Sequence, residues 1–141
     1  MIRAVPEPNR LVSYLLTHRS PITALIDDHL AQDHFSTVTA PEPLAELDRV
    51  LTYQMLQRNY TDEERTRFLA LAMALSEVVD LPETIPRICR DPSDDRVIAS
   101  AVVGGADAIV SGDDDLLAPE QVGDIPILTA AQLHEMLERG N

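Results

Sequence analysis

Two groups of acidic residues in the last third of the sequence have the residue type and the placement needed to bind a divalent cation. Asp94 and Asp95 lie at the expected start of a helix, and Asp113 to Asp115 follow a short apolar segment that ends at Ser111. Ligands of open α/β sheets bind at the carboxyl ends of the strands, so acids that directly follow an apolar strand are the first to consider. Carboxylate oxygens are the protein ligands that Mg²⁺ and Mn²⁺ prefer. The sequence therefore predicts a site for one or two such ions, which can activate a water molecule.

Five carboxylates are the predicted metal ligands: Glu7, Glu46, Asp94, Asp113 and Asp115. Glu7 follows the first expected strand, and Glu46 lies at the edge of the apolar face of its helix, from which it can reach a cleft. Clustered carboxylates without cations would repel one another, and bound Mg²⁺ or Mn²⁺ would remove that repulsion. Taken singly, Asp94 and Asp113 are explained equally well by helix capping or solvation. Their convergence favours the metal site.

The helical periodicity separates Asp94 from its neighbour Asp95. Asp94 shares one stripe with the apolar residues Val97 and Ala101 and therefore points toward the buried face. Asp95 is rotated by about 100° around the helix axis. We therefore expect Asp94 to be the ligand and Asp95 to cap the helix or face solvent.

Other catalytic chemistries are less well supported. The four histidines lack the paired spacing of a zinc-binding helix, and we expect them to be surface or partly packed residues: His18, His29, His34 and His134. The single Cys89 cannot form an internal disulfide and has no recognisable base partner. Gly104 and Gly105 lack the other glycines of a dinucleotide-binding motif and are expected to end a helix.

The charge balance argues against nucleic-acid binding through a broad basic surface. The 141 residues include 11 basic and 24 acidic side chains, and the formal net charge is −13 at pH 7. Bound cations reverse the local field of an acidic cleft, however, so a few arginines at its rim can still hold a phosphodiester. Arg90 and Arg96 flank Asp94 and are the predicted contacts to such phosphates, with ion pairs to nearby acids as the alternative. No apolar segment is long enough to span a membrane, and we expect a soluble cytoplasmic protein.

Strands and helices alternate along the chain, which predicts how the acids are brought together. Strands are expected over residues 2–5, 35–39, 78–81, 108–111 and 125–128. This alternation is typical of an α/β fold in which helices cover both faces of a central parallel sheet, here in one domain over residues 1–141. Helix starts are expected at Ser20-Pro21, at Thr39 with Glu42, at Thr61 with Glu64, at Ser93 and at Thr129 with Gln132.

Three segments together resemble the PIN domain family: Arg90-Asp-Pro-x-Asp94-Asp95, Ala106-Asp107-x-Ile-Val-Ser111-Gly112-Asp113-x-Asp115-Leu-Leu and Pro41-Glu-x-Leu-Ala-Glu46-Leu-x-Arg-Val-Leu51. The resemblance covers nearly the whole chain and is greatest to the VapC-like toxin component of bacterial toxin–antitoxin systems. It implies a three-layer α/β/α sandwich with a central parallel sheet and Mg²⁺- or Mn²⁺-dependent cleavage of RNA. It also implies an antitoxin partner and a homodimer.

The resemblance also assigns roles to individual residues. Glu46, Asp94 and Asp113 match the acids of the family's catalytic site. Asp115 matches an accessory position that is often acidic, and Ser111 matches a hydroxyl residue beside the site.

The first strand departs from the family, whose members typically have Asp-Thr-Asn where this chain has Glu7-Pro8-Asn9. Asn9 is retained and is expected, with Ser111, to orient the ligands. Glu7 keeps the negative charge but adds a methylene, and displacing a catalytic group by about 1 Å can lower a rate on the order of a hundredfold. Because Pro6 and Pro8 remove two backbone donors, we also expect this strand to be truncated or displaced.

We therefore predict a metal-dependent endoribonuclease of toxin type that is impaired by its altered first motif. The alternative is a catalytically inactive PIN-like module that binds an antitoxin or RNA. A metal-dependent nuclease acting on DNA is a third interpretation, disfavoured because the short chain lacks additions that would hold a duplex.

Overall fold

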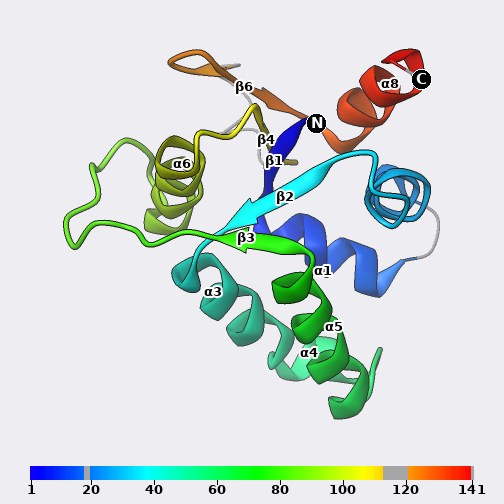
Figure 1. Cartoon of the computed structure of the whole chain (residues 1–141). Helices are drawn as coiled ribbons and strands as arrows, with labels where there is room; N and C mark the ends of the chain where they lie inside the picture. Colours follow the sequence, from blue (N-terminus) through cyan, green and yellow to red (C-terminus); the bar gives the residue numbers. More distant parts are fainter. Residues whose placement is uncertain (18–19, 113–120, 141) are drawn as a thin grey trace.

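The computed structural model describes residues 1–17, 20–112 and 121–140, and its centre is a six-stranded sheet (Figure 1). The strand order is β3-β2-β1-β4-β6-β5. Neighbouring strands are parallel except for β5 and β6, which are antiparallel. The strands are β1 (Arg3–Pro6), β2 (Ser36–Thr39), β3 (Ser76–Val78), β4 (Ala108–Val110), β5 (Gln121–Val122) and β6 (Ile125–Leu128). The expected α/β fold with a mainly parallel sheet is confirmed.

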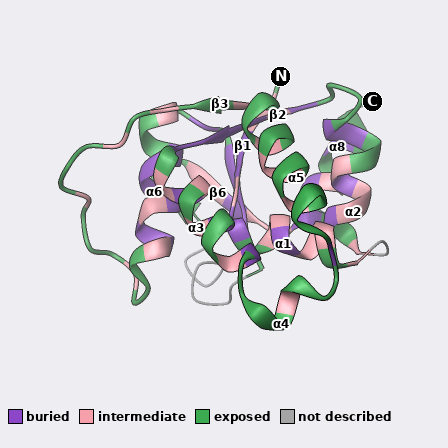
Figure 2. Cartoon of the chain, turned by 90° about the horizontal axis from the view of Figure 1, so that it is seen from below, coloured by how far each residue is buried: buried purple, intermediate pink, exposed green. Residues whose placement is uncertain are grey.

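Helices pack on both faces of the sheet, and Figure 2 shows α6 on one side of the strands and α2 and α8 on the other. The helices are α1 (Pro8–Leu16), α2 (Pro21–Leu25), α3 (Pro41–Leu51), α4 (Gln54–Gln57), α5 (Asp62–Ala74), α6 (Pro92–Gly104) and α8 (Ala130–Gly140), with a π-helical turn η1 (Ile26–Leu30) after α2. This layering buries the apolar strands from two sides, as a parallel sheet requires.

Successive residues of the central strands point into different cores, because side chains alternate across a strand. Ala4 of β1 and Val110 of β4 belong to the apolar cluster under α2, η1 and α8. Val5 and Ile109 belong to the cluster under α6. A third cluster is formed mainly by α1, α3 and α5 and has Leu47 of α3 near its centre. The first helix of this cluster, α1, begins directly after the carboxyl end of β1, where Glu7 lies.

Most of the expected helix starts are confirmed. Ser20 accepts a hydrogen bond from the backbone of Thr23, with Pro21 in the first turn. Thr61 and Glu64 form a reciprocal capping box, and Thr129 and Gln132 exchange hydrogen bonds in the same way. The stop of α6 is also confirmed, since Gly105 has φ 59° and ψ 41°, a left-handed conformation that glycine adopts without strain.

Two of the expected caps are wrong, because a proline sets the start of each helix. Pro41 and Pro92 both take the first helical position, which places the cap on the residue before the proline. The cap of α3 is therefore Ala40, and Thr39 lies in β2 instead. The cap of α6 is Asp91, whose side chain accepts a hydrogen bond of 2.9 Å from the backbone N–H of Ser93.

The expectation that the first strand is truncated or displaced is also wrong. β1 lies between β2 and β4 in the sheet, and its last residue, Pro6, is in register with Val110. The next residue, Glu7, still donates its backbone N–H to the carbonyl of Val110 at 2.9 Å. Pro8 is the first residue of α1, where the backbone N–H would have no partner within the helix. The two prolines are therefore accommodated without loss of the central strand.

Smaller differences concern the edges of the sheet. The third strand covers residues 76–78 instead of 78–81, and the two-residue β5 was not expected. The chain between α3 and α5 forms the short separate helix α4, in which Met55 is 76% exposed. Within the described part of the chain, no helix combines the length and the apolar character needed to cross a membrane.

Candidate metal centre and active site

The ends of β1 and β4 bring Glu7 and Ser111 together. These strands are parallel neighbours, so the residues that follow them lie side by side at one edge of the sheet. The hydroxyl of Ser111 donates a hydrogen bond of 2.7 Å to Oε2 of Glu7. Both residues are buried, with exposures of 4% for Glu7 and 0% for Ser111. Ser111, predicted to be a residue that orients a ligand, thus contacts one of the predicted ligands directly.

Glu7 is held as a buried carboxylate at the positive end of a helix. It is the N-cap residue of α1, but its side chain makes no capping hydrogen bond. Within the described residues, the only hydrogen-bond partner of its side chain is the hydroxyl of Ser111, which contacts Oε2. The helix dipole favours a negative charge at this position. A buried carboxylate with one neutral donor is a suitable ligand for a cation.

The packing of α6 against β1 places Asp94 at the same edge of the sheet. The last turn of α6 lies at the start of β1, since Nη1 of Arg3 donates to the carbonyl of Gly104 at 2.6 Å. The 13-residue helix then runs along the sheet, with Val97 packed in the same cluster as Val5. Its first turn therefore lies toward the carboxyl ends of the strands. Asp94, in that turn, is 5% exposed, as its position beside Val97 in the stripe predicted.

Asp95 is also buried, so the expectation that it caps the helix or faces solvent is wrong. It is 2% exposed, and its Oδ1 accepts hydrogen bonds from the backbone of Ile88 at 3.0 Å and of Cys89 at 2.7 Å. Its Oδ2 lies 3.2 Å from Nε of Arg87. Burial acts to raise the pKa of Asp95, but these hydrogen bonds and the arginine outweigh it and lower the pKa. Asp95 therefore fixes the chain segment that precedes α6.

Glu46 lies on α3 and is paired with an arginine of its own helix. Its Oε1 is 2.5 Å from Nη2 of Arg49 and its Oε2 is 3.1 Å from Nε of the same residue. The Glu46 side chain is one-fifth exposed, and α3 packs against both α1 and α6. Glu46 is thus on an element that borders the Glu7 and Asp94 region. A metal bound by Glu46 would share its carboxylate oxygens with Arg49.

A basic residue that sequence analysis did not assign to the site, Arg10, lies beside it. A Cβ atom on Gly112 would lie 2.5 Å from Cζ of Arg10, so the guanidinium packs directly on the backbone after β4. Its Nε is buried and has no hydrogen-bond partner among the described residues. An arginine in the first turn of a helix is disfavoured by the helix dipole. One feature of the sequence indicates that Arg10 lies near the site. It follows Glu7 by three residues, which is about one turn of α1.

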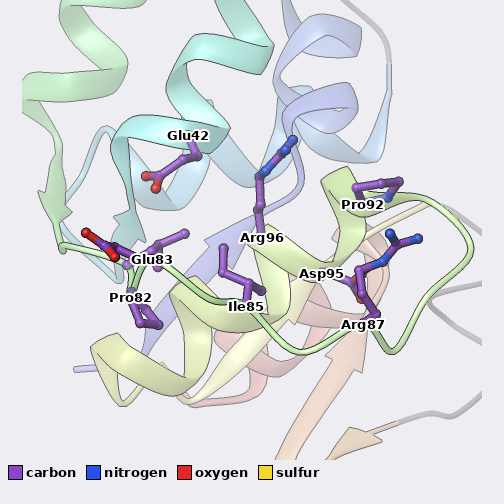
Figure 3. Close-up of a pocket in the computed structure, with 9 residues that line it drawn as sticks. Glu42, Pro82, Glu83, Ile85, Arg87, Pro92, Asp95 and Arg96 are labelled. Carbon is purple, nitrogen blue, oxygen red and sulfur yellow. The ribbon is translucent and has the colours of Figure 1, made fainter.

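The remaining predicted site residues are less closely grouped. Asn9 is exposed on α1, and Arg90 is exposed in the segment before α6. Asp113 and Asp115 lie outside the described residues. Arg96 borders a surface hollow of about 640 Å³ between α3, α6 and the segment that joins β3 to α6 (Figure 3). Other residues around this hollow include Glu42, Glu83, Arg87 and Asp95.

Comparison with known proteins identifies a family for most of the chain. The family model for the PIN domain matches residues 3–115, a range that contains all five predicted ligands. No curated protein sequence matches the chain. Among solved structures, a chain of the crystal structure of VapBC2 from Rickettsia felis bound to a DNA fragment from their promoter is similar, with a TM-score of 0.61. That alignment covers 91% of this chain and 98% of the other, at 12% sequence identity, which shows a shared fold.

Proposed function

The chain belongs to the PIN domain family, and on that premise we propose that it is an Mg²⁺- or Mn²⁺-dependent endoribonuclease of the toxin type. The observation that carries the proposal is the buried Glu7 carboxylate at the end of β1, which accepts a hydrogen bond from Ser111. Asp94, also buried, lies in the first turn of α6 toward the same edge of the sheet. Buried acids at the carboxyl edge of a parallel sheet are suited to binding a cation.

The proposed ligands differ in how directly the structure supports them. Glu7 and Asp94 are buried residues at the carboxyl edge of the sheet. Glu46 borders the region from α3, and Asp113 and Asp115 complete the proposed set from the sequence resemblance. When bound, one or two metal ions would lower the pKa of a water molecule and stabilise the leaving oxygen of the phosphodiester. Ser111 would keep the Glu7 carboxylate in one orientation.

The RNA contacts are proposed for two arginines near the metal ligands in sequence, Arg90 and Arg96. Among the described residues, neither Arg90 nor Arg96 forms an ion pair, whereas Arg87 contacts the buried Asp95. Arg96 lies on α6 two residues after Asp94 and borders the hollow in Figure 3. Its guanidinium can therefore approach a phosphate near the metal ligands. The net charge of −13 makes such local contacts, together with the ions, the basis for RNA binding.

A protein partner is proposed from the apolar surface beside α5. A groove of about 350 Å³ between α1, η1 and α5 is bordered mainly by apolar residues, among them Tyr14, Phe68, Leu71 and Leu75. The rings of Tyr14 and Phe68 are stacked, with centroids 5.9 Å apart. Leu71 is 52% exposed. The similar solved structure is of VapBC2 bound to a DNA fragment from their promoter. For this chain we propose an antitoxin partner, alongside self-association into a dimer.

The test is cleavage of a fluorescent RNA in the presence and absence of Mn²⁺. We expect cleavage that requires Mn²⁺ or Mg²⁺ and falls at least a hundredfold in Asp94→Asn. The matched control is Asp124→Asn, because Asp124 is exposed and outside the site. Cleavage that persists in excess EDTA, or that is unaffected by Asp94→Asn, would refute the proposal.

A second function, binding without cleavage, is favoured by one observation. The guanidinium of Arg10 packs at the end of β4, where a positive charge opposes the binding of a metal cation. Purified protein that binds RNA at the same affinity with Mn²⁺ and with EDTA, and does not cleave it, would identify this function. Cleavage that depends on Mn²⁺ and on Asp94 would exclude it.

A further inference from the structure

Three potential metal ligands from two distant segments meet on the face of the sheet covered by α2 and α8. They are His29 of η1, and His134 and Glu138 of α8, which are one helical turn apart. Nε2 of His29 lies 2.9 Å from Oε1 of Glu138, and Nε2 of His134 lies 3.5 Å from the same oxygen. All three ligand atoms lie within 4.8 Å of one another. Figure 2 shows α2 and α8 side by side, on the opposite side of the strands from α6.

We propose that this cluster binds a divalent transition-metal ion of the Zn²⁺ class, separate from the carboxylate site at the ends of β1 and β4. Two imidazole nitrogens with carboxylate oxygens are the ligands that Zn²⁺ and its neighbours prefer, whereas Mg²⁺ takes oxygen ligands. The cluster would therefore select a different ion from the candidate catalytic centre. Its ion would join η1 to the C-terminal helix.

The spacing of the ligand atoms agrees with tetrahedral coordination. Bonds of about 2.0–2.2 Å in a tetrahedral zinc site separate neighbouring ligand atoms by roughly 3.3 Å. The separations from Oε1 of Glu138 are 2.9 Å and 3.5 Å, on either side of that value. Asp28 lies at the edge of this group, since its Oδ2 is 3.3 Å from Nε2 of His134. The three ligand atoms, all within 4.8 Å of one another, would leave a fourth coordination position to water or to Asp28.

A neighbouring histidine can fix His29 in the form that binds a metal. Nδ1 of His29 lies 2.9 Å from Nδ1 of His34, so one of the two nitrogens carries the hydrogen. When His29 donates from Nδ1, its Nε2 has a free electron pair and points toward Glu138. Metal-binding histidines usually donate their second N–H in this way. His29 is 2% exposed, so packing also restricts its orientation.

The local charge also favours a divalent cation. Asp28 and Glu138 provide two negative charges, and within the described residues no arginine forms an ion pair with either of them. The nearest basic residue on α8, Arg139, pairs instead with Glu135 at 3.8 Å. With neutral histidines, the two carboxylates balance the charge of one divalent ion. The π-helical turn that presents Asp28 and His29 is a rare conformation, and such turns are frequent at functional sites.

The experiment is a Zn²⁺ titration of the full chain, stripped of metal, in competition with a chromophoric chelator and with excess Mg²⁺ present. We expect one equivalent to bind with micromolar affinity or better, and affinity to fall at least about tenfold in His134→Gln and in Glu138→Gln. Both side chains are partly exposed, at 26% and 56%, so the variants are expected to fold. Glu135→Gln is the matched control on the same helix and should bind Zn²⁺ as the parent does.

Thermal unfolding provides a second readout that does not depend on activity. Zn²⁺ should raise the Tm of the parent and of Glu135→Gln, and should leave His134→Gln unchanged, because binding to the folded state alone stabilises it. Asp94→Asn should retain the Zn²⁺ response, which separates this site from the carboxylate site. Failure of the parent to bind Zn²⁺ at micromolar concentration, or binding unaffected by both substitutions, would show that the cluster is only a histidine–carboxylate hydrogen-bond network.

Discussion

Ser111 donates a hydrogen bond of 2.7 Å to Oε2 of Glu7, across 104 positions of sequence. The contact exists because β1 and β4 are adjacent parallel strands that end together. It gives a buried glutamate one fixed orientation in a place where the family typically has aspartate. Glu7 is therefore built into this edge of the sheet as a positioned carboxylate, and the longer side chain has a partner of its own.

Removing this hydroxyl should weaken both the fold and the site. In Ser111→Ala, the Glu7 carboxylate loses a buried donor, and we expect the free energy of unfolding to fall by about 1–3 kcal/mol. Mn²⁺ affinity should fall as well, because the carboxylate becomes free to rotate. Urea unfolding and a Mn²⁺ titration measure the two effects.

The control for Ser111→Ala is Ser100→Ala. Ser100 is equally buried, but among the residues that the structure describes its hydroxyl donates only to the carbonyl of Arg96 within α6. That substitution should change stability by less than about 1 kcal/mol and leave Mn²⁺ affinity unchanged. Equal effects of the two substitutions on Mn²⁺ affinity would show that the Ser111 to Glu7 contact does not position a ligand.

Arg10 should oppose metal binding. The guanidinium packs on Gly112, which is two residues after the end of β4 and next to Ser111. Replacing it in Arg10→Met removes a positive charge close to the acids, and we expect Mn²⁺ affinity to rise by roughly three- to tenfold. Arg58→Met, at an exposed position on the C-terminal side of α4, is the control. A lower Mn²⁺ affinity in Arg10→Met would mean that Arg10 supports the site.

Asp95 should stabilise the fold in a pH-dependent manner. In Asp95→Asn the backbone donors of Ile88 and Cys89 lose a charged acceptor, and we expect a loss of about 2–3 kcal/mol at pH 7. The pKa of Asp95 is lowered in the folded state, so its contribution is complete above the ordinary aspartate value near 3.9 and is lost as the pH falls below it. Urea unfolding of both proteins from pH 7 to pH 3 should show the difference shrinking. A constant difference would contradict this account of Asp95.

The ion pair of Glu46 should contribute little to stability but should compete with a metal. Arg49 is more than half exposed, and exposed pairs on one helix contribute less than about 1 kcal/mol. Arg49→Met should therefore leave urea unfolding nearly unchanged and raise Mn²⁺ affinity modestly if Glu46 is a ligand. An unchanged affinity in Arg49→Met, together with an unchanged affinity in Glu46→Gln, would remove Glu46 from the site.

The main features of the fold could be predicted because they depend on local signals. The β6 strand over residues 125–128, the capping box of Thr61 and the glycine stop at Gly105 were all read from adjacent residues. Where two local signals competed, one of them decided the structure. A proline in the first helical position overruled the nearby serine and threonine as the cap of α6 and of α3.

The tertiary contacts of the site were predictable only in part. The burial of Asp94 followed from its helical stripe, but that of Asp95 did not, because the residues 88–89 that cover it come from a loop without a periodic pattern. In the cluster of His29, His134 and Glu138, His29 and Glu138 are 109 positions apart in the sequence. No sequence motif predicts that residues so far apart will meet. Such contacts depend on how η1 packs against α8.

The most direct test of the central claim, that Glu7 and Asp94 hold the catalytic metal, is a crystal structure of the chain grown with Mn²⁺, with anomalous scattering used to locate the ion. We predict an ion within about 2.3 Å of a carboxylate oxygen of Glu7 or Asp94 and bridged to the other directly or through one water. Well-ordered side chains with no ion at this edge of the sheet, and the guanidinium of Arg10 lying between the two carboxylates, would contradict it.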